Sequence, residues 1–399
     1  GVFKQPIEDF MQKMLRHDVW RYWYEESKSS PRFDPDIKVA REPWADPVVK
    51  ENIMYSGHVH AMAGMYGVLF DDDKYEKENS IVFHRDRMWE GPQEFKYNFT
   101  SLNENLYQQM IDHDWLGIPC EPNMVFIICN QMPLLGFRFH DLRKGTNLSE
   151  SANRKFKRAW EAKNVMTEDG QIITFYQVRQ DRIIPGDFGV AAHTGALMNS
   201  WNREVVRKVF PKEVNIGLRQ VADGTMVPFE KNVVGKVRAA LANGQDPNAI
   251  RNLDYRWSTP DLGFVSLFLS ELGDSKRLNA LLAHADLYMN PTWEKDGLYY
   301  PRNDESFDKN GNMVFMDPLT GNGSIAYARL NVSDGLYQFY QNPWDQNHFS
   351  QPRLTEVPND IDVLRASYVE SNRVLVLTLR GRGNKNSNAS LTIENPPES

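Results

Sequence analysis

The chain has 399 residues, of which 41% are hydrophobic and 25% are charged, and its formal net charge is −7 at pH 7. These values are typical of a soluble globular protein, and an acidic chain without a long Lys/Arg block is not expected to bind nucleic acid or an anionic membrane surface. The sequence contains no run of eighteen apolar residues, so it predicts no membrane-spanning helix.

Helical signals dominate the first 345 or so residues. Apolar residues at helical spacing predict a first helix over 7–23 and a second over 51–70, where Gly and Ala among the apolar side chains let neighbouring helices approach closely. Further helices are expected at 106–115, 124–142, 152–165, 190–202, 231–241, 262–274, 275–288 and 324–343. This alternation of helix and loop, with short β-like interruptions such as 172–179, favours paired helices arranged in a ring.

The last fifty residues differ in character. Residues 361–383 alternate between apolar and polar side chains, which predicts a β-hairpin, and 389–399 predict another strand. The expected organisation is therefore a helical catalytic domain over 1–350 and a C-terminal β extension over 351–399, packed on the helical domain.

Both cysteines lie in the stretch GIPCEPNMVFIICN of residues 117–130. The spacing between Cys120 and Cys129 is neither that of a zinc site nor that of a Cys-x-x-Cys redox pair. The apolar run around Cys129 predicts that it is a small buried apolar residue. Cys120 precedes the helix expected at 124, where backbone amides and the helix dipole can lower a thiol pKa. Glu121, between two prolines, is either a helix cap or a carboxylate held beside that thiol.

Two histidines lie on the helix expected at 51–70. His58 and His60 are two positions apart and so point to different sides, which argues against a shared metal ion. Met54 is four positions before His58 and shares its face. The sequence carries no P-loop, dinucleotide fingerprint, nucleophile elbow or HExxH motif.

Two stretches, 46–76 and 117–147, resemble the linalool dehydratase/isomerase family, through ENIMY-x-GH and CEP-x-x-x-F-x-x-CN. Weaker similarity covers 173–198 and 263–286. The resemblance implies an all-α (α/α)6 barrel and acid/base dehydration or isomerisation of an allylic tertiary alcohol in an apolar cavity, without a cofactor or metal. It also implies a possible homo-oligomer. The positions that match the family's cavity are Met54, His58, Cys120, Glu121, Phe126 and Cys129, with the two cysteines, His58 and Glu121 as catalytic groups.

The sequence also departs from the family. The family's N-terminal segment, which supplies an Asp and a Tyr to a neighbouring subunit's site, has no counterpart in the printed chain, and a family Tyr is replaced near Gly189. His193 stands where the bacterial pattern has Trp. Further substrate-binding candidates are Tyr55, Tyr176, Arg179, Arg182 and Trp257, because Arg and aromatic side chains suit a planar acidic partner such as a tropolone. Sequons at Asn98, Asn147, Asn322, Asn331 and Asn388 suggest a secretory or endomembrane route.

Three functions follow. The leading function is that of fungal enzymes of tropolonic sesquiterpene biosynthesis, which the family resembles. In this reaction a hydroxymethyl precursor loses water to give a quinone methide. The quinone methide then adds to a humulene-type alkene in a hetero-Diels–Alder reaction. The second is a linalool-type dehydratase/isomerase that acts on one small terpene alcohol. The third is a glycan-active α/α barrel, for which stacking aromatics and carboxylates are available at Trp293, Tyr299, Tyr300, Asp254, Asp261, Glu294 and Asp296.

Overall fold

The computed structural model describes residues 3–86, 91–164, 172–228, 233–246, 262–295, 297–317, 321–382 and 388–396. Three short helices open the chain: α1 (Lys4–Leu15), α2 (His17–Trp20) and α3 (Tyr22–Glu26). The single helix expected over 7–23 is divided because Arg16 adopts an extended conformation. The indole Nε1 of Trp20 donates to the Leu15 carbonyl at 3.1 Å and satisfies the end of α1.

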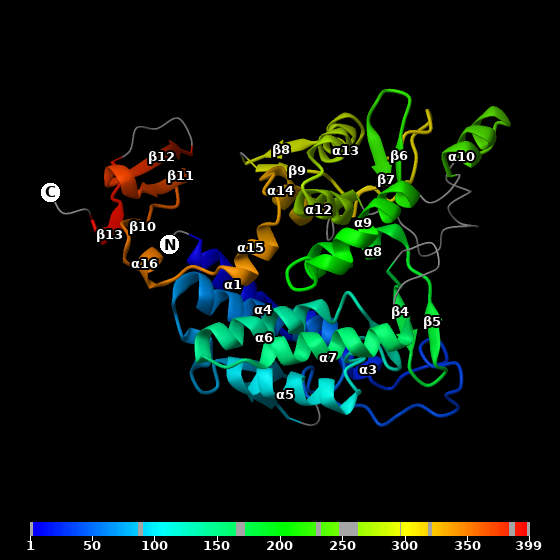
Figure 1. Ribbon diagram of the computed structural model, residues 1–399, viewed down its shortest axis with the longest axis horizontal. Coiled ribbons are helices and arrows are strands. Elements are labelled where there is room, and N and C mark those ends of the chain that lie inside the picture. The colour runs from blue at the N-terminus through cyan, green and yellow to red at the C-terminus, as the bar shows by residue number, and fades with distance from the viewer. Residues whose placement is uncertain are drawn as a thin grey trace.

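Inner helices pack one on the next in chain order: α4 (Ile53–Phe70), α6 (Gln131–Lys144), α8 (Phe188–Met198), α12 (Leu262–Leu272) and α14 (Gly321–Arg329). Outer helices pack on them: α5 (Phe99–Asp112), α7 (Leu148–Lys163), α9 (Arg203–Gly217) and α13 (Ser275–Tyr288). Figure 1 shows α4–α7 on one side and α8, α9 and α12–α14 on the other. This alternation confirms the predicted α-dominated, α/α-barrel class.

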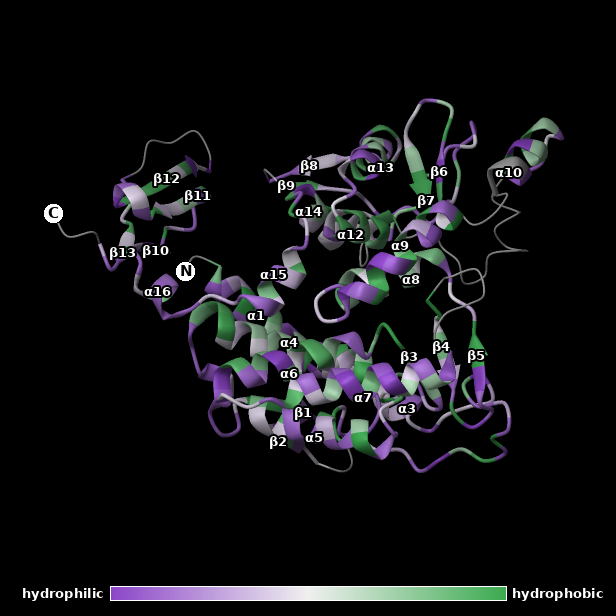
Figure 2. Ribbon diagram, viewed as in Figure 1, coloured by the Kyte–Doolittle hydropathy of each residue, from purple (hydrophilic) through white to green (hydrophobic). Residues whose placement is uncertain are grey.

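The two kinds of helix differ in their burial. The outer helix α7 buries one stripe that includes Ala152, Phe156 and Trp160, whereas α12 is buried almost all round. Figure 2 accordingly shows purple over much of α7 and green along α12. A one-sided apolar stripe suits a helix between core and solvent, and an all-round apolar helix suits the interior. The remaining helices are α10 (Val233–Ala242), α15 (Gly335–Gln341) and α16 (Gln346–Ser350), with 3-10 turns at Lys74–Glu76 and Glu370–Asn372.

Glycines allow α4 and α6 to approach closely. A Cβ at Gly136 would lie 2.2 Å from His60 Nδ1, and one at Gly64 would lie 2.7 Å from Phe139 Cβ. Both distances are far below van der Waals contact, so these helices pack at a spacing that only glycine permits. The small residues expected to bring helices together therefore do so here.

Short antiparallel sheets join the helices: β1 (Ile81–Arg85) with β2 (Gln93–Tyr97), β6 (Leu218–Gln220) with β7 (Met226–Pro228), and β8 (Thr292–Glu294) with β9 (Gly297–Tyr299). A three-stranded sheet contains β3 (Met124–Phe126), β4 (Phe175–Gln177) and β5 (Arg182–Ile184). The helix expected over 124–142 was therefore wrong at its start. Val125 pairs with Tyr176 across β3 and β4, and the helix begins at Gln131, because β-branched and aromatic residues favour a pleated surface.

The C-terminal strands are β10 (Arg353–Glu356), β11 (Ile361–Val369), β12 (Val374–Gly381) and β13 (Thr392–Glu394). Strands β11 and β12 form the predicted hairpin, and β10 pairs with β13. The boundary at residue 350 stays a prediction. Among the described residues, no helix has both the length and the apolar character needed to cross a membrane.

Candidate active site

Asn130 joins the two turns that carry the cysteines. This wholly buried side chain accepts from the Ile118 N–H at 2.8 Å and donates to the Ile118 carbonyl at 3.1 Å and the Phe126 carbonyl at 2.8 Å. Gly117 stands beside it at φ +113°, and a Cβ there would lie 2.8 Å from the Asn130 amide. The segment before Cys120 and the turn at Cys129 are thus held as one unit.

A tight turn presents Cys120. Its N–H donates to the Met124 carbonyl, and the Met124 N–H donates to the Glu121 carbonyl, each at 2.9 Å. Cys120 and Cys129 are both buried free thiols, and they hydrogen-bond to each other. That bond, together with burial and the nearby Glu121, raises the pKa of Cys120 well above its usual value.

The direction of this shift corrects the sequence expectation. Cys120 precedes a strand rather than the expected helix. The Met54 N–H, in the first turn of α4, does hydrogen-bond to Cys120 and lower its pKa, but the contact with Cys129, burial and Glu121 outweigh this effect. The buried environment favours the neutral thiol instead. Cys120 is therefore held as a proton-bearing group and not as a thiolate.

Two further groups surround this thiol. Burial raises the pKa of Glu121, although a hydrogen bond with Cys120 opposes the rise, and Glu121 Oε2 is buried without a hydrogen-bond partner. Tyr22 of α3 also lies here. Burial and the neighbouring Cys120 and Glu121 raise its pKa, and its hydroxyl donates to Asn52 Oδ1 at 2.9 Å. Sequence reasoning missed Tyr22, because it lay in an amphipathic stretch with no motif.

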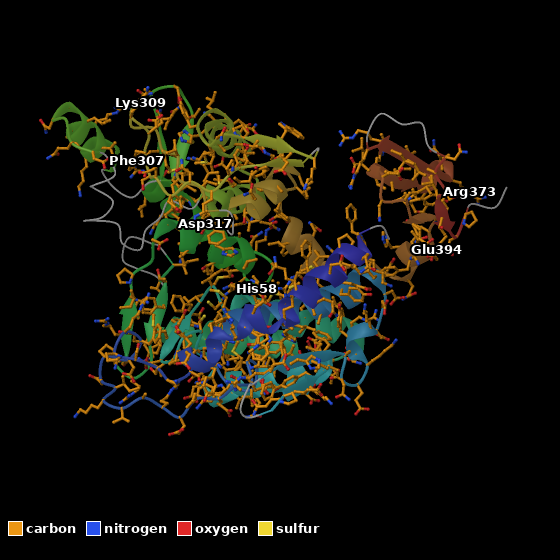
Figure 3. All side chains as sticks on the ribbon, turned by 180° about the vertical axis from the view of Figure 1, so that it is seen from behind. His58, Phe307, Lys309, Asp317, Arg373 and Glu394 are labelled. Atoms are coloured by element: carbon orange, nitrogen blue, oxygen red, sulfur yellow. The ribbon has the colours of Figure 1, made fainter. Side chains whose placement is uncertain are left out.

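His58 supplies a candidate base from α4. Its Nδ1 lies 2.5 Å from the Met54 carbonyl oxygen. Since a carbonyl only accepts, Nδ1 carries the hydrogen and Nε2 keeps a free lone pair. Burial lowers the pKa of His58, which favours the neutral ring. Figure 3 places His58 near the centre of the molecule, where α4 faces the layer that contains α8.

His193 faces the same region from α8. Its ring stacks on Phe264 of α12, with centroids 3.8 Å apart and an interplanar angle of 21°. Burial and the nearby His58 lower the pKa of His193 to about 3, so both imidazoles are neutral near pH 7. His60, by contrast, is wholly buried and bonds to Asn103 Oδ1 at 2.9 Å. The two histidines of α4 therefore point to different sides, as their spacing predicted.

The other predicted binding residues have structural partners of their own. The Tyr55 hydroxyl donates to the Met14 carbonyl at 2.5 Å, and the Tyr176 hydroxyl donates to Asp181 Oδ1 at 2.6 Å. Arg179 forms an ion pair with the buried Asp34. Within the described ranges, no hydrogen bond or ring contact joins Tyr55, Tyr176 or Arg179 to Cys120 or His58.

Of the remaining candidates, Met54 adjoins Cys120 through its backbone N–H, and the others are more dispersed. The Met54 side chain is 46% exposed. Phe126 on β3 packs against Phe175, with ring centroids 4.8 Å apart, and Arg182 is exposed on β5. Trp293 and Tyr299 are exposed on the β8–β9 hairpin, whereas the buried Tyr300 donates to Asp286 Oδ1 at 2.6 Å. The predicted positions Trp257, Asp254, Asp261 and Asp296 lie outside the described residues. No group of three or more metal-ligating side chains occurs in the described part of the chain.

Comparison with known proteins identifies the family of the chain. Residues 1–306 match the linalool dehydratase/isomerase family. The chain belongs to this family. It is therefore an enzyme of the dehydratase/isomerase type, as the two sequence stretches predicted.

One similar solved structure is a novel alpha-amylase from Clostridium perfringens. The two chains share 10% sequence identity, and their alignment covers 82% of this chain and 79% of the amylase chain, with a TM-score of 0.36. Similarity at this level does not guide the interpretation of the fold or of the site.

Proposed function

We propose that this family member dehydrates an allylic or benzylic alcohol to a quinone methide and then directs its addition to a humulene-type alkene. The observation that carries the dehydration is the hydrogen-bonded thiol pair beside Glu121, in which Cys120 holds its proton, with the free Nε2 of His58 as a base. Loss of water needs an acid at the departing oxygen and a base for the departing proton. These side chains supply both.

Cys120 is the proposed acid. Its raised pKa keeps the proton on sulfur and makes the thiolate left behind a strong base that readily takes a proton back. As the C–O bond breaks, the thiol proton leaves with the hydroxyl as water. Burial strengthens these interactions because solvent does not compete for them.

His58 is the proposed base. Its Nδ1 is fixed on the Met54 carbonyl, so Nε2 faces the substrate in its basic form. It takes the proton of the ring hydroxyl when a quinone methide forms, or of the adjacent carbon when a diene forms. Proton return from His58 to Cys120 then completes the cycle without an added cofactor.

The addition step releases no atom. One C–C and one C–O bond form between the quinone methide and the alkene while both partners are held in register, so the enzyme contributes mainly proximity and orientation. Met54, beside Cys120, and Phe126, on the strand that follows Cys120, are apolar side chains that suit the hydrocarbon partner. The stacked rings of His193 and Phe264 suit the planar partner.

The test is product analysis by mass spectrometry. The enzyme is incubated with a hydroxymethyl tropolone plus humulene, and separately with linalool, using wild type, Cys120→Ala, His58→Ala and the control His84→Ala. His84 lies exposed on β1, with its Nδ1 3.0 Å from Glu94 Oε1, so its loss is expected to leave activity intact. A stereocontrolled adduct that is lost in the Cys120 and His58 variants supports the whole proposal.

Other outcomes of this experiment distinguish the dehydration step, the addition step and the assigned catalytic residues. Water loss from linalool alone supports the single-substrate dehydratase and contradicts the addition step. Activity that survives in both Cys120→Ala and His58→Ala contradicts the assigned acid and base. Absence of any product from either alcohol contradicts the proposal as a whole.

A further inference from the structure

We infer that a basic cleft on the outer side of the barrel is a binding site for an organic phosphate. The cleft has a volume of about 530 Å³ and lies between α7 and the connection from α8 to α9. That volume is within the range of small-molecule sites. Its lining includes none of the thiol or imidazole groups of the candidate active site, so this inference does not rest on the proposed reaction.

The α7 wall is positively charged. Arg154, Lys157 and Arg158 line the cleft from positions that share one helical face. Arg154 and Arg158 are exposed and form no ion pair within the described residues. Lys157 is 4.0 Å from Glu161, a separation at which the pairing is weak.

The opposite wall adds a fourth cation. Arg203 Nη2 pairs with Asp334 at 2.5 Å, which fixes the guanidinium in this wall. The lining holds four cations against two acids, Glu161 and Glu204. The cleft therefore favours an anion.

Helix α9 begins in this wall. Asn202 precedes it, and its side chain makes no capping hydrogen bond to the first turn. The first turn thus receives no side-chain cap from Asn202, and the helix N-terminus and the basic side chains together favour an anion in the cleft. Several converging donors suit a phosphate, with its three terminal oxygens and nearly two charges, better than a carboxylate with two oxygens and one charge.

Trp201 indicates the organic part of the ligand. It lines the cleft, and its Nε1 donates to Gln131 Oε1 at 2.9 Å. This bond holds the indole in one orientation, so a rigid aromatic surface stands beside the cationic wall. A ligand that carries a ring or another flat apolar group next to its phosphate would contact both.

Isothermal titration calorimetry of the full chain with phenyl phosphate tests this inference, with benzoate as the carboxylate comparison. We expect saturable binding of phenyl phosphate that is at least about tenfold tighter than that of benzoate. The double variant Arg154→Gln/Arg158→Gln should weaken it by about tenfold or more, because it removes charge-assisted contacts.

Lys155→Gln is the matched control. Lys155 is on the same helix, but its Nζ sits 4.5 Å from the Trp115 ring centroid and does not line the cleft. The control should bind like wild type, and unchanged urea unfolding of all variants shows that the fold is intact. The inference is overturned by an absence of saturable binding, by equal losses in control and double variant, or by benzoate binding as tightly as phenyl phosphate.

Discussion

Replacing Asn130 with Ala tests whether one amide assembles the thiol pair. The substitution removes three hydrogen bonds between this wholly buried side chain and the backbone of Ile118 and Phe126. At about 1 kcal/mol for each bond, the free energy of unfolding should fall by about 3 kcal/mol. The turns that carry Cys120 and Cys129 would also separate, and a displacement of about 1 Å at a reacting group costs about 100-fold in rate.

Asn322→Ala is the matched control. Asn322 makes the same kind of contact far along the chain, accepting from the Tyr300 N–H at 2.7 Å and donating to the Tyr300 carbonyl at 2.9 Å. Urea unfolding followed by circular dichroism measures stability, and initial rates of water loss from the alcohol measure activity. Both variants should lose stability, but only Asn130→Ala should lose activity out of proportion. Equal activity losses, or an unchanged unfolding free energy in Asn130→Ala, would refute the reasoning.

Three further predictions follow. Cys120 in the folded enzyme should react with iodoacetamide at least about tenfold more slowly than in the unfolded chain near pH 8, measured by mass spectrometry, because its raised pKa leaves little thiolate. Burial raises the pKa of Glu213 from 4.5 to about 7, so the folded state holds this proton to higher pH than the unfolded state and loses stability as pH rises between those values. Glu213→Gln should therefore stabilise the fold by about 3 kcal/mol near pH 8 and have little effect near pH 4, by urea unfolding. Gly136→Ala should lower the unfolding free energy by roughly 1–3 kcal/mol, since its Cβ would meet His60 Nδ1 at 2.2 Å; wild-type stability would contradict the close packing of α4 and α6.

The sequence by itself determined much of the α-helical framework. Periodic apolar residues located α7, α12 and α13 to within a few residues, and two-residue alternation located the β11–β12 hairpin. These patterns reflect local burial, which each segment encodes in its own spacing. The ENIMY-x-GH and CEP-x-x-x-F-x-x-CN stretches also carried the family and the enzyme class, because they hold the reactive residue types in a fixed order.

The tertiary structure decided the chemical state of those residues. The sequence suggested a helix at 124 that would lower the pKa of Cys120. The structure has a β3–β4 pair there instead, and the contact with Cys129 and burial raise the pKa. Tyr22 reaches the site from a helix almost one hundred residues earlier in the chain. His193 lies on α8, in the opposite layer, close enough for His58 to lower its pKa. A pKa depends on desolvation and on neighbours from distant segments, and no local spacing encodes those contacts.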